Sequence, residues 1–306
     1  MEHEPVLRRE CVTILTAAGP GLYVDATLGA GGHAEALLGA GPEIRVLGID
    51  RDPSALELAR RRLAAHAGRV QFVRGNFADL EAHLSPLAPD GAHGVLLDLG
   101  VSSMQLDRSD RGFSFMQDGP LDMRMGEGGS DAAALLADLD APGLAALLSE
   151  LGEVRRPRAV ARAVIAARDA GRLAGTGDLR RAVESVTGPR GSHAELARVF
   201  QALRIAVNDE LAALDAALAA LPRCLAPGGR AVVISYHSLE DRRVKRAFRR
   251  ESTDCLCPPE LPVCVCGHRR SFELLTPRAL RPGPEERLHN PRARSARLRA
   301  VRRIAT

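Results

Sequence analysis

The stretch Val24-Asp-Ala-Thr-Leu-Gly-Ala-Gly-Gly-His33 decides the fold of this chain. It is an apolar run that ends in glycines, and two later apolar runs also end in polar or glycine residues, namely Gly48-Ile-Asp50 and Leu96-Leu-Asp-Leu-Gly-Val-Ser-Ser103. Glycines let a backbone turn sharply and approach a charged ligand at the start of a helix. A carboxylate that ends a strand about 20 residues later is placed to accept the hydroxyls of a ribose. The three runs together predict a site for a nucleoside cofactor.

Strand and helix patterns alternate in the first third of the chain, which predicts a parallel sheet with helices on both faces. The expected strands are 22–26, 45–50, 70–73 and 95–99. After Gln105 the pattern changes to irregular chain and then to alanine- and leucine-rich helices that continue to about Arg204. We expect one return helix over 200–221, a fifth strand over 230–236, an arginine-rich helix over 240–250 and two terminal strands over 271–276 and 296–304.

The glycine segment alone leaves two cofactor classes open, because Gly29-Ala-Gly-Gly-His-Ala34 also fits a dinucleotide fingerprint. A nicotinamide enzyme needs a second mononucleotide half, whereas here a long helical stretch follows the fourth strand. That layout is similar to the S-adenosylmethionine-dependent methyltransferase fold. We therefore expect an α/β fold, a Rossmann-like class I methyltransferase sheet with an inserted all-helical domain. The expected core is 1–106 with 205–306, and the inserted substrate-recognition domain is 107–204. An α/β domain whose glycines only make a tight turn is the alternative.

Composition describes a chain that can bury a full core: 306 residues, of which 45% are hydrophobic. No run of 18 apolar residues occurs, and the N-terminus is acidic where a secretory signal would be basic. We expect no membrane insertion or export, and a cytoplasmic location.

Positive charge gathers at the C-terminal end of the chain. From Arg242 onward there are 17 arginine and lysine residues against 6 acidic ones, a net charge of +11, so residues 1–241 carry −7 of the total of +4. This asymmetry indicates a polyanionic partner, and arginine suits bidentate contact with phosphate. Solvated surface arginines are the alternative. The candidates for phosphate contact are Arg242, Arg243, Arg246, Arg292, Arg294 and Arg297.

Four of the six cysteines lie close together in the sequence, in the pattern C-x-C-x6-C-x-C-x-H. They are Cys255, Cys257, Cys264 and Cys266, and His268 follows. Clustered cysteines indicate reduced thiols or a metal, but a one-residue gap strains two thiolates on one tetrahedral ion. Our expectation is therefore a surface loop with free thiols and no metal, and zinc remains the alternative.

The carboxyl ends of parallel strands meet at one edge of a sheet, so the residues there should surround one crevice. We expect Gly31 and Gly32 to present N–H groups to the cofactor's carboxylate at the start of the helix that His33 opens. Asp50 would accept the ribose hydroxyls, Phe77 would pack on the adenine, and Asp98 would lie near the reactive end. Taken singly, the aspartates could be helix caps and Phe77 could be core.

Long motifs make the resemblance specific. The chain resembles the bacterial RsmH (MraW) family, S-adenosylmethionine-dependent cytosine-N4 methyltransferases of 16S ribosomal RNA, over nearly its whole length. Besides the runs already quoted, the matching segments are His3-Glu-Pro-Val-Leu7, Arg111-Gly-Phe-Ser-Phe115, Asp118-Gly-Pro-Leu-Asp-Met-Arg-Met125, Phe200-Gln-Ala-Leu-Arg-Ile205, Val207-Asn208, His237-Ser-Leu-Glu-Asp241 and Asn290-Pro-Arg-Ala-Arg-Ser295. By this resemblance the cofactor contacts are Gly31, Gly32, His33, Asp50, Phe77, Asp98 and Gln105. Tyr236 stands where the family commonly has phenylalanine, and only some members have the cysteine loop.

The resemblance implies methylation of a cytidine (1402) in the decoding region of 16S ribosomal RNA, with 16S rRNA or the small ribosomal subunit as partner. DNA is not expected as a partner, and the oligomeric state does not follow from the sequence. The strand end Asp98-Leu-Gly-Val101 differs from the Asp/Asn/Ser-Pro-Pro-aromatic motif of DNA amino-methyltransferases, so the residues alone leave the target atom open. We expect Asp98 to accept from the amine and His237 to position the base or relay its proton. A structural role for His237 is the alternative. An idle RNA-binding assembly factor and a methyltransferase acting on DNA or protein are alternatives for the whole chain.

Overall fold

The computed structural model describes residues 4–102, 105–106, 108–188, 192–258, 260–261 and 263–305. His3 and Ser103 of the motifs quoted above lie outside the described residues. The chain divides into two compact units, one of Met1–Gly100 with Leu211–Thr306 and one of Val101–Glu210. The second unit therefore extends beyond the range 107–204 at both ends.

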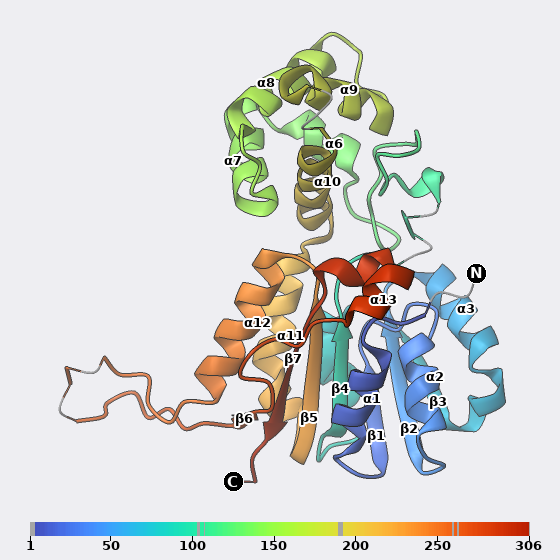
Figure 1. The fold of residues 1–306 in the computed structure, drawn as a ribbon, viewed down its shortest axis with the longest axis vertical. Helices are drawn as coiled ribbons and strands as arrows, with labels where there is room; N and C mark the ends of the chain where they lie inside the picture. Colours follow the sequence, from blue (N-terminus) through green and yellow to red (C-terminus); the bar gives the residue numbers. More distant parts are fainter. Residues whose placement is uncertain are drawn as a thin grey trace. The chain divides into compact units, whose positions relative to one another are not determined.

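The first unit contains a seven-stranded sheet among its described residues, with the strand order β3-β2-β1-β4-β5-β7-β6 (Figure 1). Strands β1 to β5 run parallel, while β7 lies antiparallel between β5 and β6. Their bounds are β1 Gly21–Asp25, β2 Ile44–Asp50, β3 Val70–Arg74, β4 Ala92–Asp98, β5 Leu225–Ser235, β6 Phe272–Leu274 and β7 Arg297–Arg303. The prediction of a Rossmann-like class I sheet with an inserted helical segment is confirmed.

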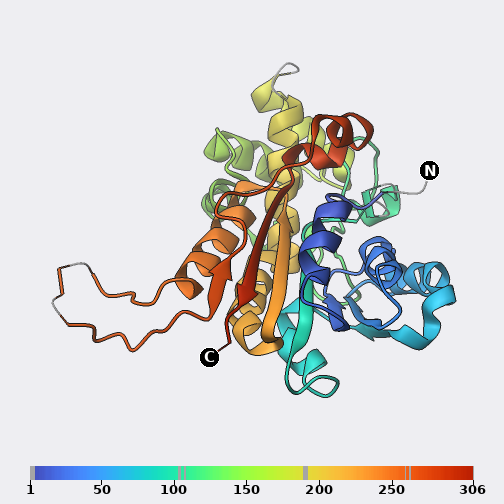
Figure 2. The same ribbon diagram turned by 60° about the horizontal axis from the view of Figure 1, so that its bottom comes forward.

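Helices cover both faces of this sheet because its central strands bury side chains on both sides (Figure 2). On β4, Val95 and Leu97 belong to one apolar core, and Leu96 between them belongs to the other. The helices of this unit are α1 Arg8–Thr16, α2 Gly32–Gly39, α3 Pro53–Arg62, α4 Leu80–Leu84, α11 Glu210–Cys224, α12 Ser238–Glu251 and α13 Pro284–His289. The first core includes residues of α4, α11 and α12, and the second includes residues of α1, α2 and α3. No helix among the described residues is long and apolar enough to cross a membrane.

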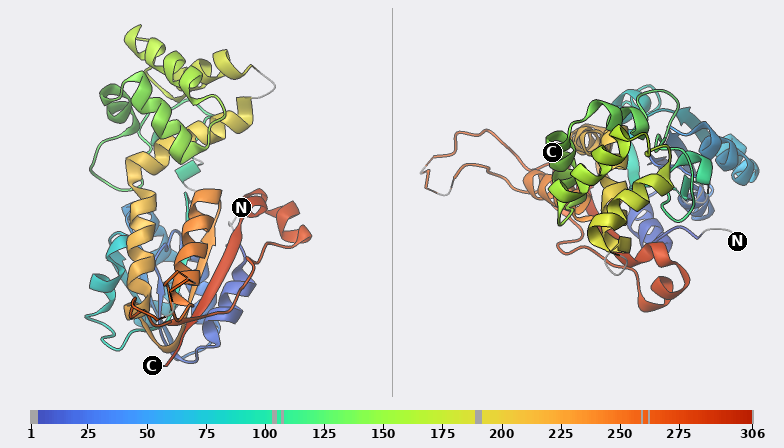
Figure 3. Two further views of the ribbon diagram at one scale, coloured as in Figure 1. Left: turned by 90° about the vertical axis from the view of Figure 1, so that its left-hand side faces the viewer. Right: turned by 90° about the horizontal axis from the view of Figure 1, so that it is seen from above.

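The second unit is helical and has an apolar core of its own (green to yellow in Figure 3). Its helices are α6 Ala132–Asp138, α7 Ala141–Gly152, α8 Pro157–Asp169, α9 Thr176–Thr187 and α10 Ser192–Asn208. Aspartates begin two of them: the Asp131 side chain accepts from the N–H of Ala134, and the Asp140 side chain accepts from the N–H of Gly143, both at 2.8 Å. Pro142 lies in the first turn of α7, where its missing N–H costs nothing.

The prediction of one return helix over 200–221 is wrong. Helix α10 ends at Asn208, α11 begins at Glu210, and Asp209 between them has a left-handed φ of 49°. The side chain of Asn208 accepts from the N–H of Met125 at 2.8 Å and donates to the carbonyl of Met123 at 2.7 Å. These bonds hold Asn208 to a distant loop and accompany a helix break that no glycine or proline marks.

Candidate active site

The glycine loop between β1 and α2 is shaped by its own hydrogen bonds. Gly31 has a left-handed φ of 81°, and its N–H donates to the carbonyl of Leu28 at 2.8 Å. This bond occupies the Gly31 donor that was expected to meet the cofactor, whereas the next residue, Gly32, begins α2. N–H groups there have no partner within the helix and favour an anion. A Cβ on Gly32 would lie 2.5 Å from Cγ of Pro5, so only glycine fits beside the N-terminal segment.

Asp50 ends β2 and fastens the glycine loop to it. Oδ2 of Asp50 accepts from the N–H of Gly29, and Oδ1 accepts from the N–H of Asp52, both at 2.8 Å. Burial raises the pKa of Asp50, and these backbone hydrogen bonds counteract the rise. Each carboxylate oxygen has two lone pairs, so the loop contacts leave acceptor capacity for a diol.

A buried polar cluster lies where β1, β4 and α2 meet. Nε2 of His33 on α2 is 3.5 Å from Oδ2 of Asp98 at the end of β4. Both ring nitrogens of His33 and Oδ2 of Asp25 are buried without a hydrogen-bond partner among the described residues. Burial raises the pKa of Asp25 to about 6, with His33 opposing that rise. Buried polar atoms are normally paired, so this cluster is suited to a polar ligand.

Asp98 is oriented from both of its neighbouring strands. Its N–H donates to Oγ1 of Thr27 at 2.6 Å, and its Oδ1 accepts from the hydroxyl of Tyr236 at 2.7 Å. Tyr236 follows β5, which pairs with β4. Burial and the negative charge of Asp98 hold the pKa of Tyr236 well above its usual value, so the phenol remains a donor. Oδ1 of Asp98 is thereby engaged, and Oδ2 is the atom nearer His33.

His237 is the N-cap residue directly before helix α12, and Glu240 of the first turn anchors its backbone. Oε2 of Glu240 accepts from the N–H of Tyr236 at 2.8 Å and from the N–H of His237 at 3.3 Å. Nε2 of His237 is 3.1 Å from Oε1 of Glu240, but the geometry is not that of a hydrogen bond, and both ring nitrogens are buried without such a partner among the described residues. Glu240 thus fixes the backbone of His237 and places a carboxylate oxygen beside its ring.

Phe77 and Gln105 differ in how the structure places them. Phe77 begins a short 3-10 turn after β3, is partly buried and packs against the first core. The strand before it, β3, pairs with β2, which Asp50 ends, and the carbonyl of Asp50 accepts from the N–H of Gly75 at 3.0 Å. Gln105 belongs to the helical unit, where its Oε1 accepts from the N–H of Ser102 at 3.0 Å. The structure therefore gathers the glycine loop, Asp50, Asp98 and Phe77 at the ends of β1 to β4.

A pocket of about 130 Å³ lies beside the start of α12. Its lining combines Tyr236, His237 and Ser238 with arginines from the C-terminal chain, Arg281, Arg294 and Arg297. Arg297 is held by Asp241, to whose Oδ2 its guanidinium donates at 2.9 Å. Of the six arginines expected to contact phosphate, Arg294 and Arg297 line this pocket, whereas Arg243 pairs with Asp215 at 3.2 Å.

Sequence reasoning missed Asp25, Glu240 and Arg281 as parts of the site. Asp25 stands inside the first quoted motif, and its place directly before the glycine loop was the available signal. Glu240 stands three residues after the N-cap His237, the spacing of a capping box. No signal in the sequence marked Arg281 among the many arginines.

The residues present fit S-adenosylmethionine. The ligand carries an ammonium, a carboxylate and a ribose diol, and the site offers the unpartnered Asp25 and His33 atoms, the first turn of α2 and the carboxylate of Asp50. Negative side chains and helix N–H groups are the partners these groups require.

Comparison with known proteins agrees with this geometry. Residues 1–304 match the MraW methylase family. The chain is 49% identical to "Ribosomal RNA small subunit methyltransferase H" of Anaeromyxobacter sp. (strain K), with 99% of this chain and 98% of that protein covered. It is also 49% identical to the proteins of that name from Thermomicrobium roseum, with 99% and 94% covered, and from Myxococcus xanthus, with 99% and 98% covered. The chain therefore belongs to the MraW methylase family of S-adenosylmethionine-dependent methyltransferases.

Proposed function

We propose that this protein methylates small-subunit ribosomal RNA, and that its target is the exocyclic N4 amine of cytidine 1402 in the decoding region of 16S rRNA. The observation that carries the proposal is Asp98, a strand-end carboxylate with one oxygen held by Tyr236, in the same crevice as a glycine loop suited to the cofactor. The names of the relatives support the substrate class, and the resemblance of the motifs supports the target atom. Such an RNA substrate implies a cytoplasmic site of action.

The cofactor would lie along the ends of β1 to β3. We assign its methionine carboxylate to the first turn of α2 at Gly32 and His33, with Gly31 shaping the turn. We assign its ammonium to the buried carboxylate of Asp25. The ribose hydroxyls would be accepted by Asp50, and the adenine would pack on Phe77. Gln105, on the helical unit, remains a cofactor contact by resemblance only. When bound, S-adenosylmethionine supplies an electrophilic methyl group on its sulfonium.

The protein's task on the acceptor side is to make a poor nucleophile reactive. The lone pair of a cytosine amine is delocalised into the ring, so the amine must be held in line and its N–H groups must be accepted. We assign that acceptor role to Oδ2 of Asp98, because Tyr236 engages Oδ1. His237, whose buried ring nitrogens have no hydrogen-bond partner among the described residues, would position the base or carry the released proton toward solvent.

The arginine pocket beside His237 would hold a phosphate of the RNA. Arg281 and Arg294 come from one chain segment and Arg297 from the start of β7, and all three meet at the N-terminus of α12. A helix N-terminus and guanidinium groups both favour phosphate. A base must leave its stack to reach such a site, and phosphate contacts keep the strand in place while it does so. We further propose that the helical unit, Val101–Glu210, recognises the RNA substrate.

Mass spectrometry of 16S rRNA nucleosides tests the target directly. Cells that lack the gene should lose one N4-methylated cytidine, and a plasmid copy should restore it. Purified protein with labelled S-adenosylmethionine should then methylate small subunits or 16S rRNA from the deletion strain, but neither DNA nor protein. Persistence of the mark in the deletion strain, or label in DNA or protein alone, would contradict the proposal.

Two substitutions test the assigned roles. Asp98→Asn should lower methyl transfer by about a hundredfold or more, because the amide is uncharged and one of the two acceptor oxygens becomes a donor NH2 group. His237→Gln should lower it less, since its role is in positioning. Calorimetry with S-adenosylmethionine distinguishes a slower reaction from loss of cofactor binding. The cofactor affinity of His237→Gln should lie within about twofold of that of the unsubstituted protein. Near-normal turnover in both variants with cofactor bound would remove Asp98 and His237 from the mechanism.

A further inference from the structure

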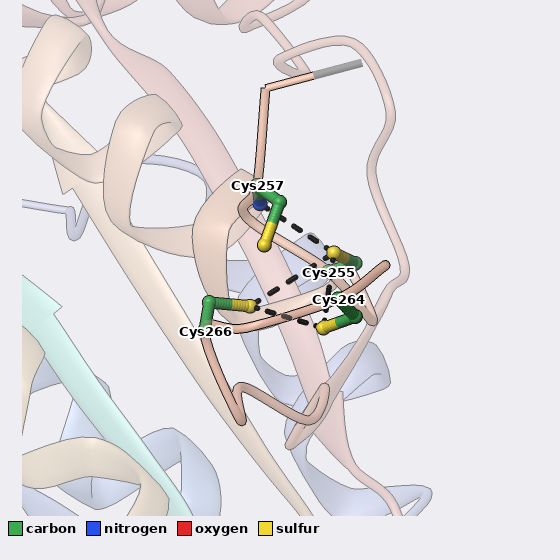
Figure 4. Close-up of side chains that lie close together, drawn as sticks. All are labelled: Cys255, Cys257, Cys264 and Cys266. Carbon is green, nitrogen blue, oxygen red and sulfur yellow. Dashed lines mark hydrogen bonds between the residues drawn. The ribbon is translucent and has the colours of Figure 1, made fainter. Parts of the chain in front are cut away.

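A long loop between α12 and β6 carries four cysteines whose side chains meet. The loop begins after Glu251, the last residue of α12, and ends at Ser271, directly before β6. Figure 1 shows it projecting from the sheet. The base is closed by the N–H of Ser271, which donates to the carbonyl of Glu251 at 2.8 Å. Cys255 and Cys257 lie on the outgoing arm, and Cys264 and Cys266 lie on the returning arm (Figure 4).

The sulfur atoms are spaced as the ligands of one tetrahedral ion would be. All four Sγ atoms lie within 4.8 Å of one another. The separations are 3.4 Å for Cys255 to Cys264, 3.9 Å for Cys255 to Cys266 and 3.6 Å for Cys264 to Cys266. Two thiolates about 2.3 Å from a tetrahedral zinc ion are about 3.8 Å apart. The pattern C-x-C is compatible with this arrangement, because residues i and i+2 of an extended arm point to the same side.

Backbone donors also surround the sulfurs. The N–H of Leu256 points to Sγ of Cys266, the N–H of Cys257 to Sγ of Cys255 and the N–H of Val265 to Sγ of Cys257, each at 3.4 Å. Hydrogen bonds of this kind disperse the negative charge that thiolates bring to a metal. His268 lies outside the cluster of four sulfurs, and its Nε2 is 3.0 Å from the carbonyl of Arg250.

The loop has no core that could hold its two arms together. None of the described residues from Ser252 to Arg270 is buried, and Val263 and Val265 are 69% and 77% exposed. A segment without apolar burial needs a cross-link or a metal to hold one conformation. Four thiols that meet at the middle of the loop could bind such a metal ion.

We propose that Cys255, Cys257, Cys264 and Cys266 bind one zinc ion that fixes this loop. Four tetrahedral thiolates suit zinc or iron, and a closed set with no open ligand position is typical of structural zinc sites. The site lies in a separate loop from Asp50, Asp98 and the glycine turn. It is therefore distinct from the cofactor site and does not depend on the proposed reaction.

Metal analysis of the full-length protein tests the proposal. Protein purified under reducing conditions should contain about one zinc per chain by mass spectrometry of the metal. Cys255→Ser with Cys264→Ser should reduce this to background, whereas the matched variant His268→Ala should retain it. Cobalt should give the strong visible bands and sulfur charge transfer of a tetrahedral tetrathiolate site. Removal of zinc by a chelator should speed tryptic cleavage at Arg269 and Arg270 at least tenfold.

Three results would overturn the proposal. The first is metal-free protein in which all four thiols react freely. The second is an intact mass lower by two hydrogens for each cysteine pair, which indicates disulfides. The third is iron in place of zinc, with its visible absorption. Calorimetry with S-adenosylmethionine provides the folding control, because a folded double cysteine variant should bind the cofactor as the unsubstituted protein does.

Discussion

The hydroxyl of Tyr236 donates a 2.7 Å hydrogen bond to Oδ1 of Asp98. The two residues lie 138 positions apart in the chain and meet because β4 and β5 pair in parallel. The bond joins the strand end that carries the candidate acceptor to the strand end that leads to His237. Because burial keeps the phenol protonated, the bond persists over the pH range in which the enzyme would work.

Tyr236→Phe should therefore slow methyl transfer without disturbing the cofactor. The change removes one hydrogen bond to a carboxylate but introduces the phenylalanine that the family commonly has here, so we expect kcat to fall only about threefold, less than the ~1.4 kcal/mol of a tenfold change in rate. Single-turnover methylation of small subunits measures the effect, and calorimetry should show cofactor affinity within about twofold of the unsubstituted protein. Unchanged turnover would mean that Asp98 needs no help from Tyr236.

Asp25 should make the stability of the protein fall as pH rises. Burial raises its pKa from 3.8 to about 6, so the folded chain holds this proton more tightly than the unfolded chain. Well below pH 3.8 Asp25 is protonated in both states and its contribution to stability is complete. As pH rises from about 3.8 to 6 the unfolded chain ionises first, and that stability is lost. The loss reaches about 3 kcal/mol above pH 6.

Asp25→Asn should remove this dependence. In urea unfolding without cofactor, the variant should equal the unsubstituted protein near pH 4 and exceed it by up to about 3 kcal/mol at pH 7.5. Its affinity for S-adenosylmethionine should fall, because the ammonium loses its carboxylate. A variant with the same pH profile as the unsubstituted protein would show that Asp25 does not carry the shift.

Gly32 and Pro5 should behave as a coupled pair. Alanine at position 32 places a Cβ 2.5 Å from Cγ of Pro5, so Gly32→Ala should displace either the N-terminal segment or the first turn of α2. We expect cofactor affinity to fall about tenfold or more. Adding Pro5→Ala removes the clashing ring atoms and should restore most of the loss, and a double-mutant cycle of cofactor binding measures this coupling. Strictly additive losses would place the effect elsewhere.

The sequence predicts those parts of the fold that depend on local pattern. Strands β1, β2 and β4 are largely buried and therefore appear as apolar runs, and Asp50 and Asp98 end two of them. The break at Asp209 does not appear in this way. It coincides with hydrogen bonds of Asn208 to the backbone of Met123 and Met125, more than eighty positions away.

The same distinction applies to the site. The glycine turn is visible in the sequence, but the bond that engages the N–H of Gly31 depends on the conformation of the turn. The sequence contains Tyr236 but does not predict its contact with Asp98, because that contact depends on the register of two strands far apart in the chain. The cysteine spacing alone argues against one ion, and only the path of the two arms brings the four sulfurs together.

Arg294 should contribute to RNA affinity through charge. It lines the pocket beside His237 with Arg281, and each phosphate contact that forms releases condensed counterions. Arg294→Gln should weaken binding of small subunits or 16S rRNA and reduce the slope of log affinity against log salt by about 1. Arg61→Gln is the matched control, because Arg61 pairs with Glu57 on the exposed face of α3 and lines no part of this pocket. Filter binding over a range of salt concentrations gives both slopes. If the two variants share the slope of the unsubstituted protein, the pocket does not hold a phosphate, and the basic C-terminal segment must contact RNA through other arginines.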